Sequence, residues 1–290
     1  MDSTAGTASS KSHTQSAATS PGRIVHRHSI ATRVTHWVTF VALLVLMMSG
    51  LQIFNAAPYL DASDKSDPGR RVLSIDGQDT PSGSVGVTTL FGHAITTTHV
   101  LGYTDDGQGA GGESARAFPG WITFPGYQDL AGGRRWHFFF AWIFVIAGAS
   151  YLIFGGIGKE LPLIVLRPSD LPKLWPMQAY YFHLRKEPPD HGKYNPLQKA
   201  GYTGVLFVLA PFVIVTGLVL APGCDAIAHP VVWLLGGRQF ARTWHFVAMI
   251  AFIGFFFGHV FLVVSTGFFN NMRSMIAGTY RLGKHEGTGP

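Results

Sequence analysis

The sequence offers a single cysteine, Cys224, for sulfur chemistry. One cysteine cannot form an intrachain disulfide, build a cysteine-rich iron–sulfur site or supply the two-cysteine motif that attaches haem covalently. Charged residues are also scarce: they make up 13% of the 290 residues, against about 25% in an average soluble domain. Because 47% of the residues are hydrophobic, this composition excludes a soluble enzyme and predicts a membrane protein.

Long uncharged runs support this interpretation. Four of them reach the length of about 20 apolar residues that a bilayer crossing requires, at 34–60, 136–158, 200–224 and 243–272. They predict helices at about 34–56, 136–157, 200–221 and 243–269. The expected fold class is therefore an all-α integral membrane protein, a four-helix transmembrane bundle.

Two further uncharged segments are not expected to cross the membrane. The run 80–104 is rich in glycine and threonine and contains two histidines. Transfer of such a segment into lipid is unfavourable, so we expect a folded loop within a long insert, residues 57–133. The run 226–237 has about half the length that a crossing needs and is expected to lie at the membrane interface.

Basic residues are distributed unevenly between the two sides of these helices. Segments 1–33, 159–199 and 273–290 hold 14 Lys and Arg against 6 Asp and Glu, whereas segments 61–135 and 225–242 hold 8 against 10. By the positive-inside rule, both termini are expected in the cytoplasm and the insert in the periplasm of a bacterial inner membrane. The net charge of +6 then reflects topology and indicates no nucleic-acid partner.

The chain divides into three predicted regions. Residues 1–23 are rich in Ser, Thr, Ala and Gly and lack an apolar core, which predicts a disordered cytoplasmic tail. Residues 24–275 form the transmembrane domain with its insert. Residues 276–290 are expected to be a cytoplasmic C-terminal tail.

Two histidines, His245 and His259, share the last uncharged run. Fourteen residues of helix bring the second side chain to within about 40° of the first, about 21 Å further along the axis. Ionisable groups inside spanning helices are functional-site candidates, and neutral imidazole is a good iron ligand. Matching membrane depths pairs His36 with His259 and His137 with His245. We predict that each pair supplies the axial ligands of one haem b, two haems in all.

Small and basic residues flank the predicted ligands. Gly50 lies fourteen residues after His36, at the depth of the outer haem, where a porphyrin needs a backbone without bulky side chains. Three basic residues are candidate contacts for the haem propionates: Arg33, Arg135 and Arg242. Ordinary helix packing by glycine and ordinary membrane anchoring by arginine remain open alternatives.

Several motifs carry a family resemblance: Thr35-His36-Trp37, Ser49-Gly50, Lys193-Tyr194-Asn195 with Gln198-Lys199, and Trp244-His245 with His259. Together they resemble the bacterial cytochrome b561 and nickel-hydrogenase cytochrome b family. This family includes the cytochrome b subunits of formate dehydrogenase, hydrogenase and thiosulfate reductase. The resemblance covers residues of about 24–275.

The resemblance implies a subunit that transfers electrons between membrane quinone and a periplasmic redox partner, often a molybdopterin enzyme. It also implies a quinone site on the cytoplasmic side at Asn195 and Gln198, close to the inner haem. For these two residues, a helix-starting turn without a quinone role is an open alternative. No catalytic residue is assigned, because two bis-histidine irons have no open coordination position.

The long insert departs from the formate dehydrogenase pattern and leaves the identity of the partner open. We expect its last part, with Trp121, Phe124 and Tyr127, to form a docking platform over the outer haem. His93 and His99 are either solvated loop residues or part of a loop haem or metal site. The direction of electron flow and the oligomeric state, including a homo-oligomer, stay open.

Other function classes fit the sequence less well. A metal-ion transporter would need acidic partners along its pathway, and the predicted helices contain no Asp or Glu. A structural anchor would need no buried histidines. The main alternative is a stand-alone cytochrome b561-type oxidoreductase, acting on ferric iron or superoxide, without a dedicated partner.

Overall fold

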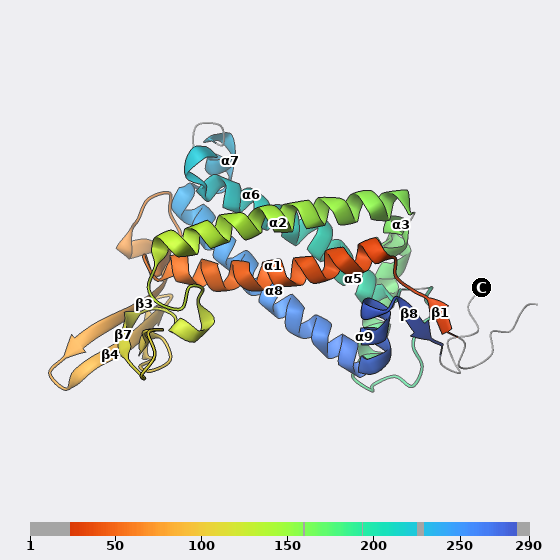
Figure 1. Cartoon of the computed structure of the whole chain (residues 1–290), viewed down its shortest axis with the longest axis horizontal. Coiled ribbons are helices and arrows are strands. Elements are labelled where there is room, and N and C mark those ends of the chain that lie inside the picture. The colour runs from red at the N-terminus through yellow and green to blue at the C-terminus, as the bar shows by residue number, and fades with distance from the viewer. Residues whose placement is uncertain (1–23, 159, 193, 225–228, 283–290) are drawn as a thin grey trace, which may run out of the picture.

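The computed structural model describes residues 24–158, 160–192, 194–224 and 229–282. The predicted tail 1–23 and the last residues of the predicted C-terminal tail, 283–290, lie outside these described residues. Long helices cross the middle of the molecule, and strands lie at both of their ends (Figure 1). We call these the sheet end, where β3 and β4 lie, and the β1–β8 end.

Four helical stretches are long and apolar enough to cross a membrane: α1 (Ile30–Phe54), α2 (Leu130–Ile157), Pro196–Leu220 and α8 (Arg238–Ser265). A polar side chain caps the N-terminus of each of the first three. Ser29, Asp129 and Asn195 each accept a hydrogen bond from the backbone N–H three residues later, which satisfies a donor that a helix leaves unpaired. α8 instead follows Gly237, whose φ of 99° suits glycine.

The third stretch is not a uniform α-helix. It contains α5 (Pro196–Gly204), a π-helical turn η4 (Val205–Leu209) and α6 (Ala210–Leu220). Pro211 lies at the start of α6 and has no backbone N–H, so it cannot continue the regular hydrogen-bond ladder. The irregular turn before it accommodates this missing donor.

The predicted all-α fold class is wrong, because the described residues contain eight strands. Four of them form one antiparallel sheet in the order β2 (Tyr59–Asp61), β3 (Arg71–Thr80), β4 (Gly83–Leu90) and β5 (His93–Thr96). Two more pair beside it, β6 (Gly102–Asp105) and β7 (Glu113–Arg116). The run 80–104, expected as a loop, is rich in Val and Thr, which fit an extended, half-buried strand.

The last two strands lie at the opposite end of the long helices (Figure 1). β1 (Ile24–His26) pairs antiparallel with β8 (Thr279–Arg281), in the register Val25 to Tyr280. The segment before α1 is thereby joined to the segment after α9 (Phe268–Ile276). This pairing closes the β1–β8 end of the molecule.

Shorter helical elements connect these parts. They are η1 (Pro68–Arg70), η2 (Gly120–Ile122), α3 (Leu161–Ile164), η3 (Pro168–Lys173), α4 (Leu174–Tyr181), η5 (Pro222–Cys224) and α7 (His229–Leu234). The last of these falls within the run 226–237, which the sequence places at the membrane interface. Its Trp233 and Leu234 are largely exposed.

Two apolar clusters hold the long helices and the strands together. Ala42 of α1, Phe144 of α2 and Phe252 of α8 meet in the middle of the helices. At the sheet end, Phe54 of α1 packs with Ile75 of β3 and other buried residues of the insert. Because this second cluster joins a spanning helix to the sheet, the strands are fixed against the helices.

Candidate functional site

Two pairs of histidines face each other between the long helices. His36 of α1 and His259 of α8 have ring centres 6.2 Å apart, with an interplanar angle of 50°. His137 of α2 and His245 of α8 also have ring centres 6.2 Å apart, with an angle of 66°. The structure therefore brings together the members of both predicted pairs.

The separation within each pair fits two axial ligands on one metal ion. Metal–imidazole bonds are about 2 Å long and each nitrogen lies about 1 Å from its ring centre, so two imidazoles on one iron have ring centres about 6 Å apart. Two imidazole donors leave the remaining in-plane positions of a six-coordinate iron to a porphyrin. The residues present therefore fit a haem b at each pair.

A hydroxyl and a glycine on α1 hold the imidazole of His137. Ser49 Oγ lies 3.1 Å from His137 Nδ1. A Cβ atom added at Gly50 would lie 3.4 Å from His137 Cε1, so a larger residue there would press on the ring. Gly50, predicted to pack against the outer haem, thus lies directly against one of its predicted ligands, and its contact with haem stays a prediction.

The same arrangement recurs on α6, where it holds the imidazole of His245. Thr216 Oγ1 lies 3.0 Å from His245 Nδ1, and a Cβ atom added at Gly217 would lie 3.3 Å from His245 Cε1. Neither hydroxyl was predicted from the sequence as part of the site. The available signal was the repeat of a hydroxyl residue followed by glycine in two apolar helices.

The pair at the β1–β8 end has different surroundings. Nδ1 of His36 is buried and has no hydrogen-bond partner among the described residues. The ring of Trp37 meets the His36 ring edge to face at 5.3 Å, and Phe255 stacks on His259 with ring centres 5.8 Å apart. An aromatic ring thus packs against each imidazole of this second pair.

The three arginines predicted to contact haem propionates have different environments. Arg33 donates to the Ile276 carbonyl at 2.6 Å. Arg242 donates to the Ala57 carbonyl and its guanidinium lies 5.3 Å from the centre of the Tyr59 ring. Arg135 is exposed. Two of them thus tie a spanning helix to a neighbouring segment, and the propionate role of all three stays a prediction.

Asn195 and Gln198, the predicted quinone residues, start α5. Asn195 Oδ1 accepts from the Gln198 backbone N–H at 2.9 Å, and Gln198 Oε1 accepts from the Asn195 backbone N–H at 3.1 Å. This reciprocal pair is a capping box. The Asn195 amide also donates to the Tyr181 hydroxyl at 3.0 Å. Both side chains therefore stabilise the start of α5, and a role in quinone binding would come in addition to this structural role.

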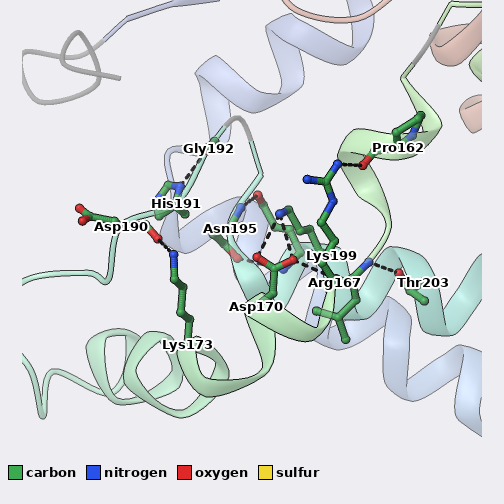
Figure 2. Close-up of polar contacts among 12 residues, drawn as sticks. Pro162, Arg167, Asp170, Lys173, Asp190, His191, Gly192, Asn195, Lys199 and Thr203 are labelled. Carbon is green, nitrogen blue, oxygen red and sulfur yellow. Dashed lines mark hydrogen bonds and ion pairs between the residues drawn. The ribbon is translucent and has the colours of Figure 1, made fainter. Parts of the chain in front are cut away.

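A largely buried ion pair lies beside this cap (Figure 2). Lys199 Nζ is 3.1 Å from both carboxylate oxygens of Asp170, and the Arg167 backbone N–H donates to the same carboxylate at 3.0 Å. The hydrogen bond from Arg167, followed by that from Lys199, holds the pKa of Asp170 below its usual value, although burial acts in the opposite direction. Burial raises the pKa of the nearby Tyr181.

At the sheet end, a buried arginine joins the insert to α1. Arg116 of β7 is 3% exposed and donates to Gln52 Oε1 at 3.2 Å and Thr123 Oγ1 at 3.0 Å. It also donates to the backbone carbonyls of Asp106 and Gly126. Burial lowers the pKa of this guanidinium. This network was not predicted from the sequence, because a single arginine in a long insert gives no signal of its partners.

These helices and imidazole pairs define a class of protein, the membrane-spanning b-type cytochromes. The chain belongs to the prokaryotic cytochrome b561 family, whose model matches residues 27–278. Membership implies haem b binding in an integral bacterial membrane protein. The family resemblance seen in the sequence motifs is thereby confirmed.

A curated relative matches over most of its length. The chain is 27% identical over 238 residues to a putative protein-methionine-sulfoxide reductase subunit, YedZ1, of Azospira oryzae. The match covers 80% of this chain and 86% of the relative. The similarity therefore extends over the spanning helices and is not confined to one motif.

Proposed function

We propose that this chain is a di-haem cytochrome b that transfers electrons across the membrane between quinone and a periplasmic redox partner. His36 and His259 hold one haem, and His137 and His245 hold the other. The observation that carries this proposal is the separation of 6.2 Å in both pairs. Each bound haem supplies a one-electron redox centre.

The spanning helices give the two sites their positions. His245 and His259 lie fourteen residues apart on α8, which corresponds to about 21 Å of helix. Apolar residues such as Phe144 and Phe252 fill the space between the helices in the middle of the membrane. They exclude water from the space between the two sites, and haems held there by two histidines each would supply electron transfer without binding a substrate at iron.

The charge distribution supports a sidedness for the protein. The segments at the β1–β8 end are basic and those at the sheet end are slightly acidic, so we place the β1–β8 end in the cytoplasm and the strands of the insert in the periplasm. The cap formed by Asn195 and Gln198 then lies on the cytoplasmic side. We assign it to the quinone site because the pair His36 and His259 lies at the same end of the helices.

The partner is proposed to dock on the insert. Trp121 is 75% exposed and Tyr127 is 52% exposed, and both precede α2, which carries His137. Phe124 instead packs against Trp136, with ring centres 5.1 Å apart. The relative's name describes a reductase subunit, which favours a subunit working with a partner over a stand-alone oxidoreductase. Because a reductase accepts electrons, we propose that electrons flow from quinol to the partner, and the family resemblance of the sequence motifs leads us to propose a periplasmic molybdopterin enzyme as its class.

The first experiment counts haems. The detergent-purified chain is expected to give a reduced-minus-oxidised spectrum with two haem b per chain by pyridine haemochrome quantitation. Alanine substitution of His36 or His259 is expected to remove one haem, and substitution of His137 or His245 the other. A well-folded wild-type chain without haem would overturn the proposal.

A second experiment tests the docking surface. Trp121→Ala with Tyr127→Ala is expected to slow electron transfer to the periplasmic partner while leaving both haems in place. The matched control is Trp233→Ala, because Trp233 is 77% exposed but belongs to α7 and not to the insert. Equal transfer rates in the double variant and the wild type would rule out this surface.

A further inference from the structure

The hydroxyl of Ser49 can only accept a hydrogen bond from His137. It is fully buried and lies 2.6 Å from the Val45 carbonyl oxygen of its own helix. A hydroxyl has one hydrogen and a carbonyl oxygen only accepts, so that hydrogen is committed to Val45. The contact of 3.1 Å with His137 Nδ1 is therefore a hydrogen bond that the imidazole donates.

The same reasoning applies to Thr216 and His245. Thr216 is fully buried, and its hydroxyl lies 2.9 Å from the Phe212 carbonyl oxygen. Its contact of 3.0 Å with His245 Nδ1 must then be donated by the imidazole. Both imidazoles at the sheet end are thus fixed as the tautomer with hydrogen on Nδ1, which leaves the Nε2 lone pair free to bind a metal.

A hydrogen bond at Nδ1 also changes the ligand. An imidazole that donates to an oxygen is a stronger electron donor through its other nitrogen, and such partners commonly tune metal affinity and redox potential. Stronger donation stabilises ferric over ferrous iron and so lowers the reduction potential. The other pair lacks this support at His36, whose Nδ1 has no partner in the described part of the chain.

We propose that Ser49 and Thr216 are matched positioning residues that orient His137 and His245 and lower the reduction potential of the haem at the sheet end. This inference rests on the proposed haem ligation. It assigns different potentials to the two haems because both imidazoles of the sheet-end pair contact a hydroxyl, whereas Nδ1 of His36 has no hydrogen-bond partner among the described residues. Neither residue touches iron, and each acts through the imidazole beside it.

The test is a redox titration of the purified holoprotein followed by its haem absorbance. Thr216→Val replaces the hydroxyl by a methyl group of similar size, and Thr216→Ser keeps the hydroxyl. Thr216→Val and Ser49→Ala are expected to raise the midpoint potential of one haem only, by about 59 mV for each tenfold loss of preference for the ferric state. Thr216→Ser is expected to match the wild type.

A control variant removes a comparable hydroxyl that meets no histidine. Thr35 is buried in α1 and its hydroxyl donates to the Ala31 carbonyl at 2.7 Å. Thr35→Val is expected to leave the potential of the sheet-end haem unchanged. The low-spin ferric spectrum of that haem, recorded by electron paramagnetic resonance, is expected to shift in Ser49→Ala and Thr216→Val but not in Thr35→Val.

The outcomes separate this inference from the proposed function. A wild-type chain without haem overturns the proposed function itself. Two haems whose potentials and spectra are the same in the wild type, Ser49→Ala and Thr216→Val overturn the inference alone. If Thr216→Val loses the sheet-end haem, the affinity of its apoprotein for added haem is compared with that of Thr216→Ser. A loss of affinity of roughly 10- to 100-fold in the valine variant that serine restores supports the positioning role. An equal loss in the valine and serine variants contradicts it.

Discussion

Gln52, in the last turn of α1, accepts a hydrogen bond from the Arg116 guanidinium at 3.2 Å, and neither side chain is more than 3% exposed. The Gln52 amide in turn donates to the Tyr127 carbonyl at 2.9 Å. Gln52 lies one turn beyond Ser49, which contacts His137. The insert is therefore attached at the same part of α1 that supports a proposed haem ligand.

Replacing Arg116 should detach the insert. Arg116→Met removes four hydrogen bonds, to Gln52, Thr123 and two backbone carbonyls, and this loss is expected to cost about 3 kcal/mol in total. We expect a lower melting temperature and faster proteolysis within residues 57–133. Arg70→Met is the control, because Arg70 is exposed. Equal protease resistance of Arg116→Met and wild type would show that the network does not hold the insert.

The ion pair between Asp170 and Lys199 predicts an acid-dependent loss of stability. The pKa of Asp170 is lowered in the folded state, so its carboxylate stabilises the fold above its unfolded pKa of about 4. That contribution disappears as the pH falls below about 4. Melting temperatures measured from pH 3 to pH 7 should therefore fall less steeply in Asp170→Asn than in the wild type.

The control for this pH series is Asp190→Asn. Asp190 is exposed, and its backbone carbonyl, rather than its carboxylate, accepts from Lys173. Its pH profile is expected to follow the wild type. An Asp170→Asn profile parallel to the wild type at every pH would contradict a stabilising role for the carboxylate.

Side-chain volume at Gly50 and Gly217 should control the sheet-end site. A Cβ atom at these positions would lie 3.4 Å and 3.3 Å from the imidazoles of His137 and His245. Alanine is expected to have a modest effect and leucine to remove about one haem per chain, because the larger side chain needs the space of the ring. Gly156→Leu serves as the control, since its nearest neighbour is the flexible Leu161 at 3.7 Å. A full haem complement in Gly50→Leu would contradict the predicted packing.

Two substitutions of Asn195 separate its cap from its proposed quinone role. Asn195→Ala removes the cap, at a cost of about 1 kcal/mol, and Asn195→Ser keeps a capping oxygen but loses the amide that donates to Tyr181. If the amide serves quinone chemistry, both variants slow quinol-dependent haem reduction, while alanine, which loses the cap as well as the bond to Tyr181, lowers the melting temperature more than serine does. Wild-type reduction rates in Asn195→Ser would assign the residue to the cap alone.

The sequence located the long helices because apolar runs report directly on transfer into lipid. It placed their starts four to six residues too late, since α1 begins at Ile30 and α2 at Leu130, where charged or polar residues interrupt the apolar run. A helix continues beyond the lipid to a polar cap such as Ser29 or Asp129. Hydropathy does not detect that extension.

The strands could not be read in the same way. The run 80–104 was recognised as unfit for lipid, but the partners of its strands lie elsewhere in the chain, as where β3 pairs with β4 over residues 73–90. Local sequence patterns do not reveal such pairing.

The site, like the fold, could be predicted only in part. The spacing of His245 and His259 on one helix predicted two depths, because periodicity is local. The contact of Thr216 with His245 depends on how α6 packs against α8, which spacing alone does not reveal.

The placement of both His245 and His259 on α8 makes the two sites mechanically dependent on each other. Any rigid displacement of α8 changes the distance from His245 to His137 and from His259 to His36 at the same time. A partner that binds at the sheet end and shifts α8 therefore alters the pair near the opposite end without touching it. One continuous helix provides a route for coupling between the two faces of the membrane.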